Sequence, residues 1–329
     1  MFSGLLFAVL AAAFVFEFIN GFHNTANAIA TTVYTRALPP RVAILMSATM
    51  NVLGALMSEN VALTIAKGLV DVQLELHVIL AALIGAIIWD LFTWWRAIPS
   101  SSSHALIGSL IGATIMFTGG TKDVIWSGVL NKVIIPIFTS PLIGLCLGYL
   151  FMRLVFEICA NVQVHKANAF FHKAQIASSM FMAYSHGNND AQKTMGIITI
   201  ALASVGAYTG EGIPLWVKLF CAATMALGTS IGGQRIMKTV GSGVTKLEPV
   251  MGFVSETSSA IAIEVMTALG APVSTTQVIT TSIMGAGTAK GAKKVKWGIG
   301  YQMLTAWIVT LPATMLLGGC VAWLVGLIF

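Results

Sequence analysis

Long hydrophobic runs with few charges alternate with short polar breaks along the whole chain. Runs long enough to cross a bilayer, roughly 20 residues each, lie at 3–19, 42–66, 76–95, 133–156, 213–233, 250–269 and 298–328. Shorter runs, interrupted by glycine or polar residues, lie at 21–34, 104–118, 176–186, 187–207 and 273–288. The long runs predict membrane-spanning helices, and the short ones predict broken helices or re-entrant hairpins. The pattern therefore predicts an all-α polytopic membrane protein.

The composition supports the same class. Of 329 residues, 57% are hydrophobic and only 9% are charged, whereas soluble domains carry about 25% charged residues. Too few charges remain to cover a water-facing surface, so we expect lipid as the main surroundings. The net charge of +6 comes from basic residues in the short breaks, where it sets membrane topology. We therefore expect no nucleic-acid partner.

Three segments of the first half recur in the second half in the same order. The pairs are GFHNTANA (21–28) with GNNDAQKT (187–194), VLGA (52–55) with ALGT (226–229), and PSSSSHALIGSLIGA (99–113) with PVSTTQVITTSIMGA (272–286). The offsets are 166, 174 and 173 positions. They predict two structural repeats, 1–159 and 176–329, joined by a polar loop at 160–175. An odd number of crossings between the repeats would make them inverted.

The lysine distribution predicts the orientation in the membrane. Four lysines lie within 290–298, and two more lie in the central loop 160–175. Because basic loops favour the cytoplasmic side, both segments are expected there, with the C-terminus outside.

The repeated Pro–Ser/Thr segments predict an anion site. In each copy a proline halts one helix and a run of hydroxyl residues opens the next, where Ser and Thr are favoured as N-caps. Free N–H groups, the positive end of the helix dipole and the hydroxyls together suit an oxyanion. The alternative is that the hydroxyls only satisfy backbone groups at a kink. The residues concerned are Ser101, Ser102, Ser103, His104, Ser274, Thr275, Thr276 and Gln277.

The repeated Asn/Asp segments predict a cation site beside a break in each helix. Asn24, Asn27, Asn189 and Asp190 supply the oxygen ligands that hard cations prefer. A lone charge at the membrane centre costs roughly 2.5–3.5 kcal/mol, so Asp190 needs a partner, and Lys193 is the nearest candidate. Alternatives are a closed structural Asp190–Lys193 pair, or proton transfer through Asp190.

Three further carboxylates are candidates for a proton relay. Asp90 and Glu264 lie at near-equivalent positions before the two Ser/Thr turns, and Glu256 lies in an apolar context without a repeat partner. His104 adds a group that could titrate, although a neutral hydrogen-bonding role is open as well.

Motifs of other protein classes are absent or out of context. GTSIG (228–232) matches a nucleophile elbow, but it lies in an apolar helical segment and is better interpreted as helix packing, like GSLIG (108–112) and GLCLG (144–148). The chain has no Walker A, Rossmann or HExxH motif. Its four cysteines lie far apart, so we expect small buried side chains rather than a metal site or disulfides.

The quoted motifs carry a resemblance to a known family. NGFHNTANAIATTVYTRAL, PSSSSHALIG, SHGNNDAQKTMGIIT and PVSTTQ resemble the inorganic phosphate transporter (PiT) family, and most closely its bacterial low-affinity phosphate permeases. The resemblance extends from Glu17 to about Lys296. It implies an all-helical fold of two inverted repeats with re-entrant hairpins, commonly a homodimer. It also implies secondary transport of inorganic phosphate with Na⁺ or H⁺, in some relatives as a metal–phosphate complex.

By this analogy the hairpin serines and threonines, with His104, Gln277 and Lys193, line the phosphate site. Asn24, Asn27, Asn189 and Asp190 line the coupling-cation site. One departure matters, because the family usually has Asp where this chain has Asn24. Asn keeps an oxygen ligand but loses a charge, which affects the cation stoichiometry and the preferred anion.

We therefore expect a phosphate:cation symporter in the cytoplasmic membrane, not an enzyme. The coupling ion is H⁺ or Na⁺, a divalent metal is a conceivable co-substrate, and no resident cofactor or metal is expected. A sulfate permease of the same family is the alternative. An intramembrane hydrolase using Ser103 and His104 is disfavoured because adjacent helical residues face different directions. Two matching motifs with a buried Asp also favour a transporter over a passive channel.

Overall fold

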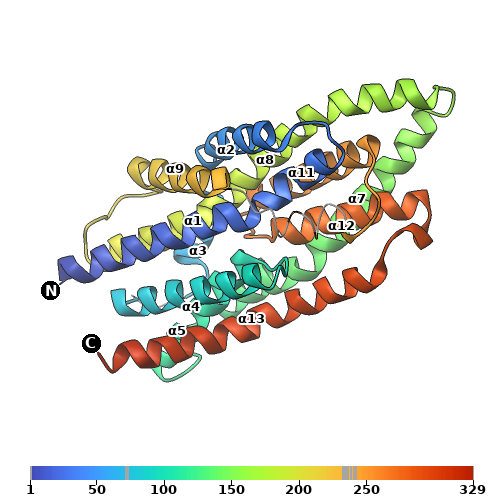
Figure 1. Ribbon diagram of the computed structural model, residues 1–329. Helices are drawn as coiled ribbons and strands as arrows, with labels where there is room; N and C mark the ends of the chain where they lie inside the picture. Colours follow the sequence, from blue (N-terminus) through green and yellow to red (C-terminus); the bar gives the residue numbers. More distant parts are fainter. Residues whose placement is uncertain (1, 71–73, 232–236, 238, 240–242, 329) are drawn as a thin grey trace.

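The hydrophobic runs fold into helices, most of which run roughly along the long direction of the molecule (Figure 1). The computed structural model describes residues 2–70, 74–231, 237, 239 and 243–328. Within them lie α1 (Phe2–Tyr34), α2 (Pro40–Ala55), α3 (Asn60–Lys67), α4 (Leu76–Trp95), α5 (Ser102–Thr118), α6 (Trp126–Val129), the π-helical turn η1 (Leu130–Ile134), α7 (Ile135–Ile158), α8 (Val164–Ser204), α9 (Leu215–Ile231), α11 (Pro249–Ala268), α12 (Thr275–Lys290), the 3₁₀ turn η3 (Ala292–Lys294) and α13 (Trp297–Gly326). The expected all-helical architecture is confirmed for this described part.

Four helical segments of the described chain are long and apolar enough to cross a membrane: α1, α4, the α6–α7 segment and α13. The span predicted at 42–66 is not one straight helix: α2 and α3 are bent by 64° at a short break, and together they are apolar enough for a broken span or a re-entrant loop. Of the helix predicted at 213–233, the structure shows Leu215–Ile231 as α9, and residues 232 and 233 lie outside the described residues. The helix predicted at 250–269 forms as α11 but is not among the four, because its serines, threonines and two glutamates make it less apolar.

The predicted breaks at the two Asn/Asp motifs are wrong. Helix α1 runs unbroken for 33 residues through Asn24 and Asn27, and α8 runs for 41 residues through Asp190 and Lys193. Polar side chains are tolerated inside these helices because they find partners on other helices. The backbone carbonyls at the motifs are therefore used within the helices, and only side chains remain as ligands there.

The expected central loop at 160–175 is also mostly helical. Helix α7 ends at Ile158, and α8 begins at Val164. The first turns of α8 are polar and exposed, so the low hydrophobicity of 160–175 did not indicate a helix. The second half of α8 is buried. The repeat boundaries stay a prediction.

Two helical hairpins enter the molecule from opposite ends (Figure 1). One is formed by α4 and α5, the other by α11 and α12, and the helices within each hairpin pack against one another. Each hairpin turns at a predicted Pro–Ser/Thr segment. Because the hairpins enter from opposite ends, their two turns lie in the middle of the molecule (Figure 1). Helices α5 and α12 have 17 and 16 residues, which is short of a full span.

Each half packs its helices onto the other half at equivalent places. Helix α1 packs on α9 and α2 packs on α8, while α5 packs on α13 and α12 packs on α7. Glycines permit two of these close crossings: a Cβ on Gly21 or Gly228 would meet backbone of the facing helix, and the same holds for Gly54 and Gly187. The interpretation of GTSIG as packing is thus supported at its first glycine; Gly232 lies outside the described residues.

We expect Gly54→Leu to destabilise the protein by about 3 kcal/mol, because a side chain there meets backbone atoms of Tyr184 and Asn188 that cannot move independently. Thermal unfolding in detergent measures the loss. Gly4→Leu is the matched control, since a Cβ at Gly4 has no neighbour within 4 Å. An unchanged melting temperature in Gly54→Leu contradicts the close crossing.

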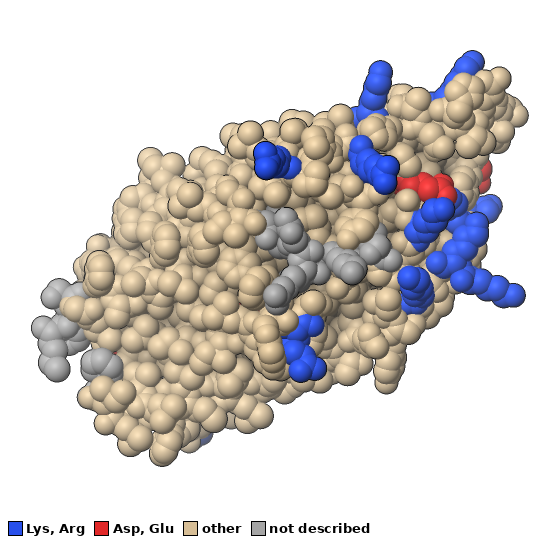
Figure 2. Space-filling view, in the orientation of Figure 1, with Lys and Arg blue, Asp and Glu red and all other residues tan. Residues whose placement is uncertain are grey.

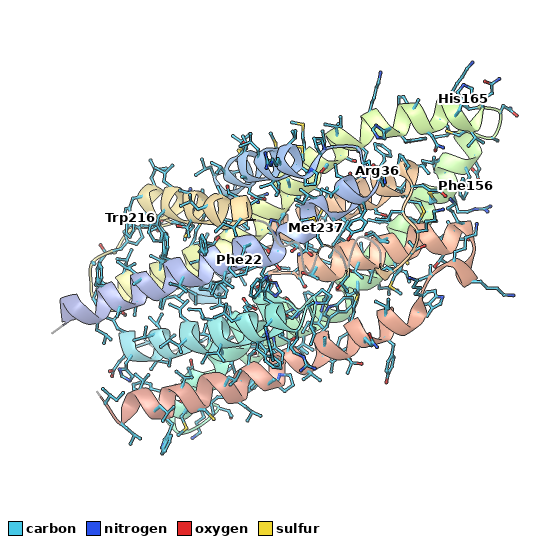
Figure 3. The ribbon with its side chains drawn as sticks, in the orientation of Figure 1. Phe22, Arg36, Phe156, His165, Trp216 and Met237 are labelled. Carbon is cyan, nitrogen blue, oxygen red and sulfur yellow. The ribbon has the colours of Figure 1, made fainter. Side chains whose placement is uncertain are left out.

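Charge is distributed unevenly along the long axis. Lysine and arginine side chains gather at the end away from the two termini (Figures 1 and 2). Arg36, Phe156 and His165 lie toward that end, and Trp216 lies toward the other (Figure 3). The C-terminus and the lysine cluster are thus at opposite ends, as their predicted orientation requires. The cysteines differ from expectation: Cys221 is buried, whereas Cys146 and Cys320 are exposed on apolar helices.

Candidate functional site

The two hairpin turns begin their second helices in the same way. Ser101 is the N-cap of α5 and accepts a hydrogen bond from the His104 N–H at 3.3 Å. Ser274 is the N-cap of α12 and accepts from the Gln277 N–H, also at 3.3 Å. The predicted capping is therefore present in both copies. In each first turn the remaining N–H groups lack partners within their own helix, which gives both turns the chemistry of an anion site.

The tips of the two hairpins touch. The Ser103 hydroxyl donates to the backbone oxygen of Val273 at 3.0 Å, and the Lys193 ammonium donates to the same oxygen at 3.2 Å. Lys193 is 1% exposed, so its charge lies fully inside the protein. Two helix starts with positive dipole ends and one buried ammonium are thus concentrated in one place.

Asp190 neutralises that ammonium and joins both halves of the chain. Its Oδ1 lies 2.5 Å from Lys193 Nζ. Its Oδ2 accepts from Asn24 at 3.0 Å and from the Thr275 hydroxyl at 3.3 Å, with His186 Nε2 at 3.3 Å. Asp190 is 0% exposed, so desolvation makes these partners necessary. The predicted Asp190–Lys193 pair is present.

Asn24 continues the network along α1. Its amide donates to Asn20 Oδ1 at 2.7 Å and lies 3.4 Å from the Ser102 hydroxyl, and its Oδ1 lies 3.2 Å from His23 Nδ1. Of these neighbours among the described residues, Asp190 alone carries a carboxylate. Asn24 therefore acts as a neutral donor to the carboxylate that occupies the equivalent position in the second half.

Residues that align between the two halves make matching contacts. Asn27 donates to the Thr276 hydroxyl at 2.7 Å, and Lys193 donates to the Ser103 hydroxyl. Both bonds run from a long helix of one half to the hairpin of the other. The bonds Asn24–Ser102 and Asp190–Thr275 match in the same manner, but within one half.

The remaining predicted site residues lie at the edge of this centre. Asn189 turns to Thr267 Oγ1 at 2.8 Å and to the Ala271 carbonyl at 3.3 Å. His104 and Gln277 are buried, and His104 Nδ1 and both Gln277 side-chain polar atoms have no hydrogen-bond partner among the described residues. Asn27 Oδ1 and Asn189 Oδ1 are likewise buried and unpaired there, so they could receive a cation.

The three relay candidates are not brought together. Asp90 is buried on α4. Glu256 belongs to a different cluster, and Glu264 accepts from Asn188 at 3.0 Å. Glu256 is held by four donors from α1 and α8, which are Thr31 at 2.5 Å, Thr32 at 2.7 Å, Gln175 at 3.1 Å and Ser178 at 2.5 Å. The structure thus provides no single carboxylate chain through these three residues.

Our sequence reasoning missed Glu17 and Asn20 as members of the centre. Glu17 is 0% exposed, accepts a hydrogen bond from Thr194 and lies 3.5 Å from Asn20 Nδ2. Spacing could have revealed them, because Glu17, Asn20 and Asn24 are separated by three and four positions and so share one helical face. His186 was also missed, although it lies four positions before Asp190 and therefore on the same helical face.

Apolar helices around a buried polar centre at the meeting point of two hairpin tips define a multi-pass membrane protein built as a solute transporter. Residues 20–318 match the family model described as "Phosphate transporter family". The chain belongs to this phosphate transporter family. The family expected from the motifs is therefore confirmed.

Individual relatives agree with the family. The chain is 46% identical over 317 residues to a "Probable low-affinity inorganic phosphate transporter" of Mycobacterium bovis, covering 95% of this chain and 76% of the relative. Equally named proteins of Bacillus subtilis (44%, covering 99% and 98%) and Rhizobium meliloti (43%, covering 95% and 94%) are also similar. Because its relatives are named as transporters, the chain is a transporter and not an enzyme.

A solved structure described as "The sodium-dependent phosphate transporter" has a similar fold. The TM-score is 0.90, with 24% identity, 99% of this chain and 100% of that chain covered. This likeness concerns the fold alone.

Proposed function

We propose that the protein is a secondary active transporter that moves inorganic phosphate across the cytoplasmic membrane together with H⁺ or Na⁺. The observation that carries the proposal is the meeting of two capped helix starts, rich in hydroxyls, around the buried Lys193–Asp190 pair. The names of the relatives support phosphate as the anion. The name of the structural neighbour is compatible with Na⁺, and H⁺ is equally compatible with the site's chemistry.

Phosphate would bind between the two hairpin tips. The first-turn N–H groups of α5 and α12 supply donors, and Ser102, Ser103, Thr275 and Thr276 supply hydroxyls. Lys193 would share its positive charge between Asp190 and the anion. Because phosphate carries four oxygens in tetrahedral geometry, donors that converge from two opposite helix starts suit it well.

The coupling cation would offset the charge that phosphate brings. Phosphate added to the neutral Lys193–Asp190 pair leaves the buried centre negative, and an uncompensated charge there is costly. A proton on a carboxylate, or Na⁺ on side-chain oxygens of Asn27, Asn189 and Asp190, restores the balance. A divalent metal that enters with phosphate would do the same.

The matching contacts of Asn27 with Thr276 and of Lys193 with Ser103 support two inverted repeats, whose relative movement would carry phosphate across the membrane. Each long helix contacts the hairpin of the other half, and the hairpins enter from opposite ends (Figure 1). Rocking of one hairpin against α1 and α8 would open the centre to one side at a time. The expected homodimer remains part of the proposal and does not enter the mechanism.

Loss of the Ser103 or the Thr276 hydroxyl is expected to weaken phosphate binding about 10-fold, because one hydrogen bond to a charged group contributes ~1.5 kcal/mol. Ser103→Ala and Thr276→Val should therefore raise the KM of phosphate uptake by similar factors. Initial rates in proteoliposomes across phosphate concentrations measure this. Ser204→Ala serves as control, because this hydroxyl donates to the Ala201 carbonyl of its own helix near the end of α8. An unchanged KM in both variants contradicts the assigned phosphate position.

The proposed function is tested by uptake of radiolabelled phosphate into proteoliposomes under imposed Na⁺ or pH gradients. We expect uptake above equilibrium under at least one gradient, with little competition from sulfate. Parallel samples with a divalent metal or a chelator show whether phosphate enters as a metal complex. Absent phosphate uptake under every gradient, with sulfate uptake intact, would overturn the proposal in favour of a sulfate permease.

A further inference from the structure

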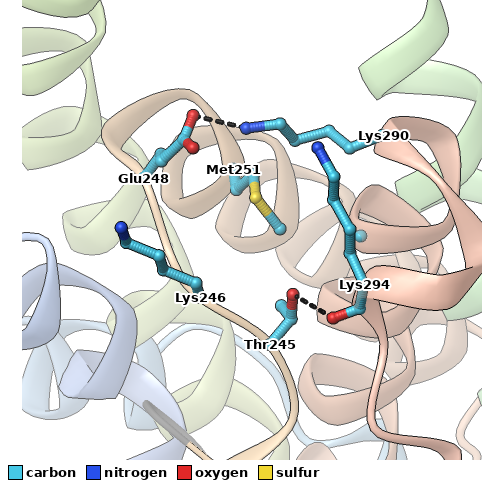
Figure 4. A pocket seen from close by; sticks show the side chains of 7 residues that line it. Thr245, Lys246, Glu248, Met251, Lys290 and Lys294 are labelled. Atoms are coloured by element: carbon cyan, nitrogen blue, oxygen red, sulfur yellow. Dashed lines mark hydrogen bonds and ion pairs between the residues drawn. The ribbon is translucent and has the colours of Figure 1, made fainter.

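A basic cavity lies at the lysine-rich end of the protein, away from the centre (Figure 4). Its volume is about 310 Å³, and its lining consists of Thr245, Lys246, Glu248, Met251, Gly287, Lys290 and Lys294. This volume falls at the lower end of the range for small-molecule sites, ~300–1,000 Å³. Lys290 ends α12, whose first turn belongs to the centre, so the helix rise of 1.5 Å per residue separates the two places by about 22 Å.

The walls of this cavity are tied together by the fold. The Thr245 hydroxyl donates to the Lys294 carbonyl at 3.1 Å, and the Lys296 N–H donates to the Val244 carbonyl at 2.9 Å. These bonds join the segment before α11 to the turn η3 before α13. The cavity is thus formed by three elements that converge, α11, α12 and η3, rather than by lysines scattered on a surface.

The charges of the lining do not balance. Three lysines face one glutamate, and that glutamate, Glu248, is paired with Lys290 at 2.5 Å. Lys246 and Lys294 form no ion pair within the described part of the chain. The side chain of Lys294 nevertheless extends toward that of Lys290 (Figure 4). The Lys290 ammonium itself points to Glu248 (Figure 4), but positive charges on neighbouring side chains still repel, and an anion bound beside them would offset the repulsion.

We propose that this cavity binds a phosphate-bearing anion through Lys246, Lys290 and Lys294. A phosphate group carries enough negative charge to satisfy the two unpaired lysines and to compete with Glu248 for Lys290. The group comes either from inorganic phosphate in solution or from the headgroup of an anionic phospholipid. The bound group holds the end of α12 against η3, which leads into α13. It therefore restrains the rocking of the α11–α12 hairpin, although it lies far from the transport centre.

The test is residue-resolved lysine acetylation of the full-length protein in nanodiscs, with rates read by mass spectrometry. One arm uses discs of neutral phosphatidylcholine with or without millimolar inorganic phosphate. The other arm uses phosphatidylcholine discs with or without phosphatidylglycerol, in a buffer free of inorganic phosphate. Lys293 is the internal control, because it lies beside Lys294 on η3 but does not line the cavity.

We expect Lys246 and Lys294 to be protected several-fold in one arm while Lys293 reacts at an unchanged rate. Protection by inorganic phosphate identifies a soluble anion, and protection only by phosphatidylglycerol identifies a lipid headgroup. Lys294→Gln should then abolish the protection of Lys246, whereas Lys293→Gln should preserve it. Protection in neither arm, or equal protection of Lys293, overturns the proposal. None of these outcomes depends on transport through the centre.

Discussion

Asp190→Asn is expected to reduce coupled phosphate uptake at least ~100-fold. The substitution leaves Lys193, 1% exposed, without a counter-charge, and removal of one partner from a buried pair costs about 3–5 kcal/mol. It also replaces one acceptor oxygen by an NH₂ group, although three donors, from Asn24, Thr275 and Lys193, point at this carboxylate. Both the binding of phosphate and the compensation of its charge are therefore disturbed. Initial uptake rates in proteoliposomes measure the loss.

A misfolded variant would also show no uptake, so a second variant is needed. Asp190→Asn combined with Lys193→Met removes both charges and should restore a folded protein, as judged by size-exclusion chromatography and thermal unfolding. We expect this double variant to remain inactive, because phosphate loses its ammonium and the cation loses its carboxylate. Glu211→Gln, at an exposed position outside the helices, is the control for a general loss of charge. Coupled uptake at the native rate in either Asp190 variant contradicts the role assigned to this residue.

The sequence predicted the parts of the centre that depend on local chemistry. Hydroxyl runs after Pro99 and Pro272 predicted two capped helix starts, and both caps are present. The three-residue spacing of Asp190 and Lys193 predicted their pair, because residues three apart on a helix are neighbours. Repeat alignment predicted which residues correspond, and the corresponding residues do make matching contacts.

The parts that failed depend on contacts between distant segments. We read the polar residues of the Asn/Asp motifs as a break, yet on α1 the residues Glu17, Asn20, Asn24, Asn27 and Thr31 follow one helical face. A polar stripe of this kind is compatible with an unbroken helix whenever other helices supply partners. Those partners, such as Thr276 for Asn27, are about 250 positions away, and no local pattern identifies them. The 64° bend between α2 and α3 was likewise not predicted from the hydrophobic pattern.

Restoring a carboxylate with Asn24→Asp is expected to increase the number of cations that uptake requires. Asn24 Nδ2 lies 3.0 Å from Asp190 Oδ2, so the variant would place two carboxylates side by side with Lys193 as the nearest counter-charge. Two like charges at ~4 Å repel by about 4 kcal/mol at an effective dielectric constant near 20. This repulsion is relieved only when another Na⁺ or proton binds between them. At low cation concentration the variant should therefore transport on the order of a hundred-fold more slowly than the native protein.

The decisive measurement is the dependence of uptake on the coupling cation at saturating phosphate. A carboxylate that recruits one more cation makes this dependence steeper, so the Hill coefficient rises, and saturating cation restores most of the rate. Asn24→Ala is the matched control: it loses the hydrogen bonds to Asn20 and Asp190 without adding a charge, so its rate falls without a steeper dependence. If Asn24→Asp and Asn24→Ala show the same slope, charge at this position does not set the stoichiometry. A steeper slope in Asn24→Asp alone means that the native asparagine lowers the cation requirement by keeping one of two equivalent positions neutral.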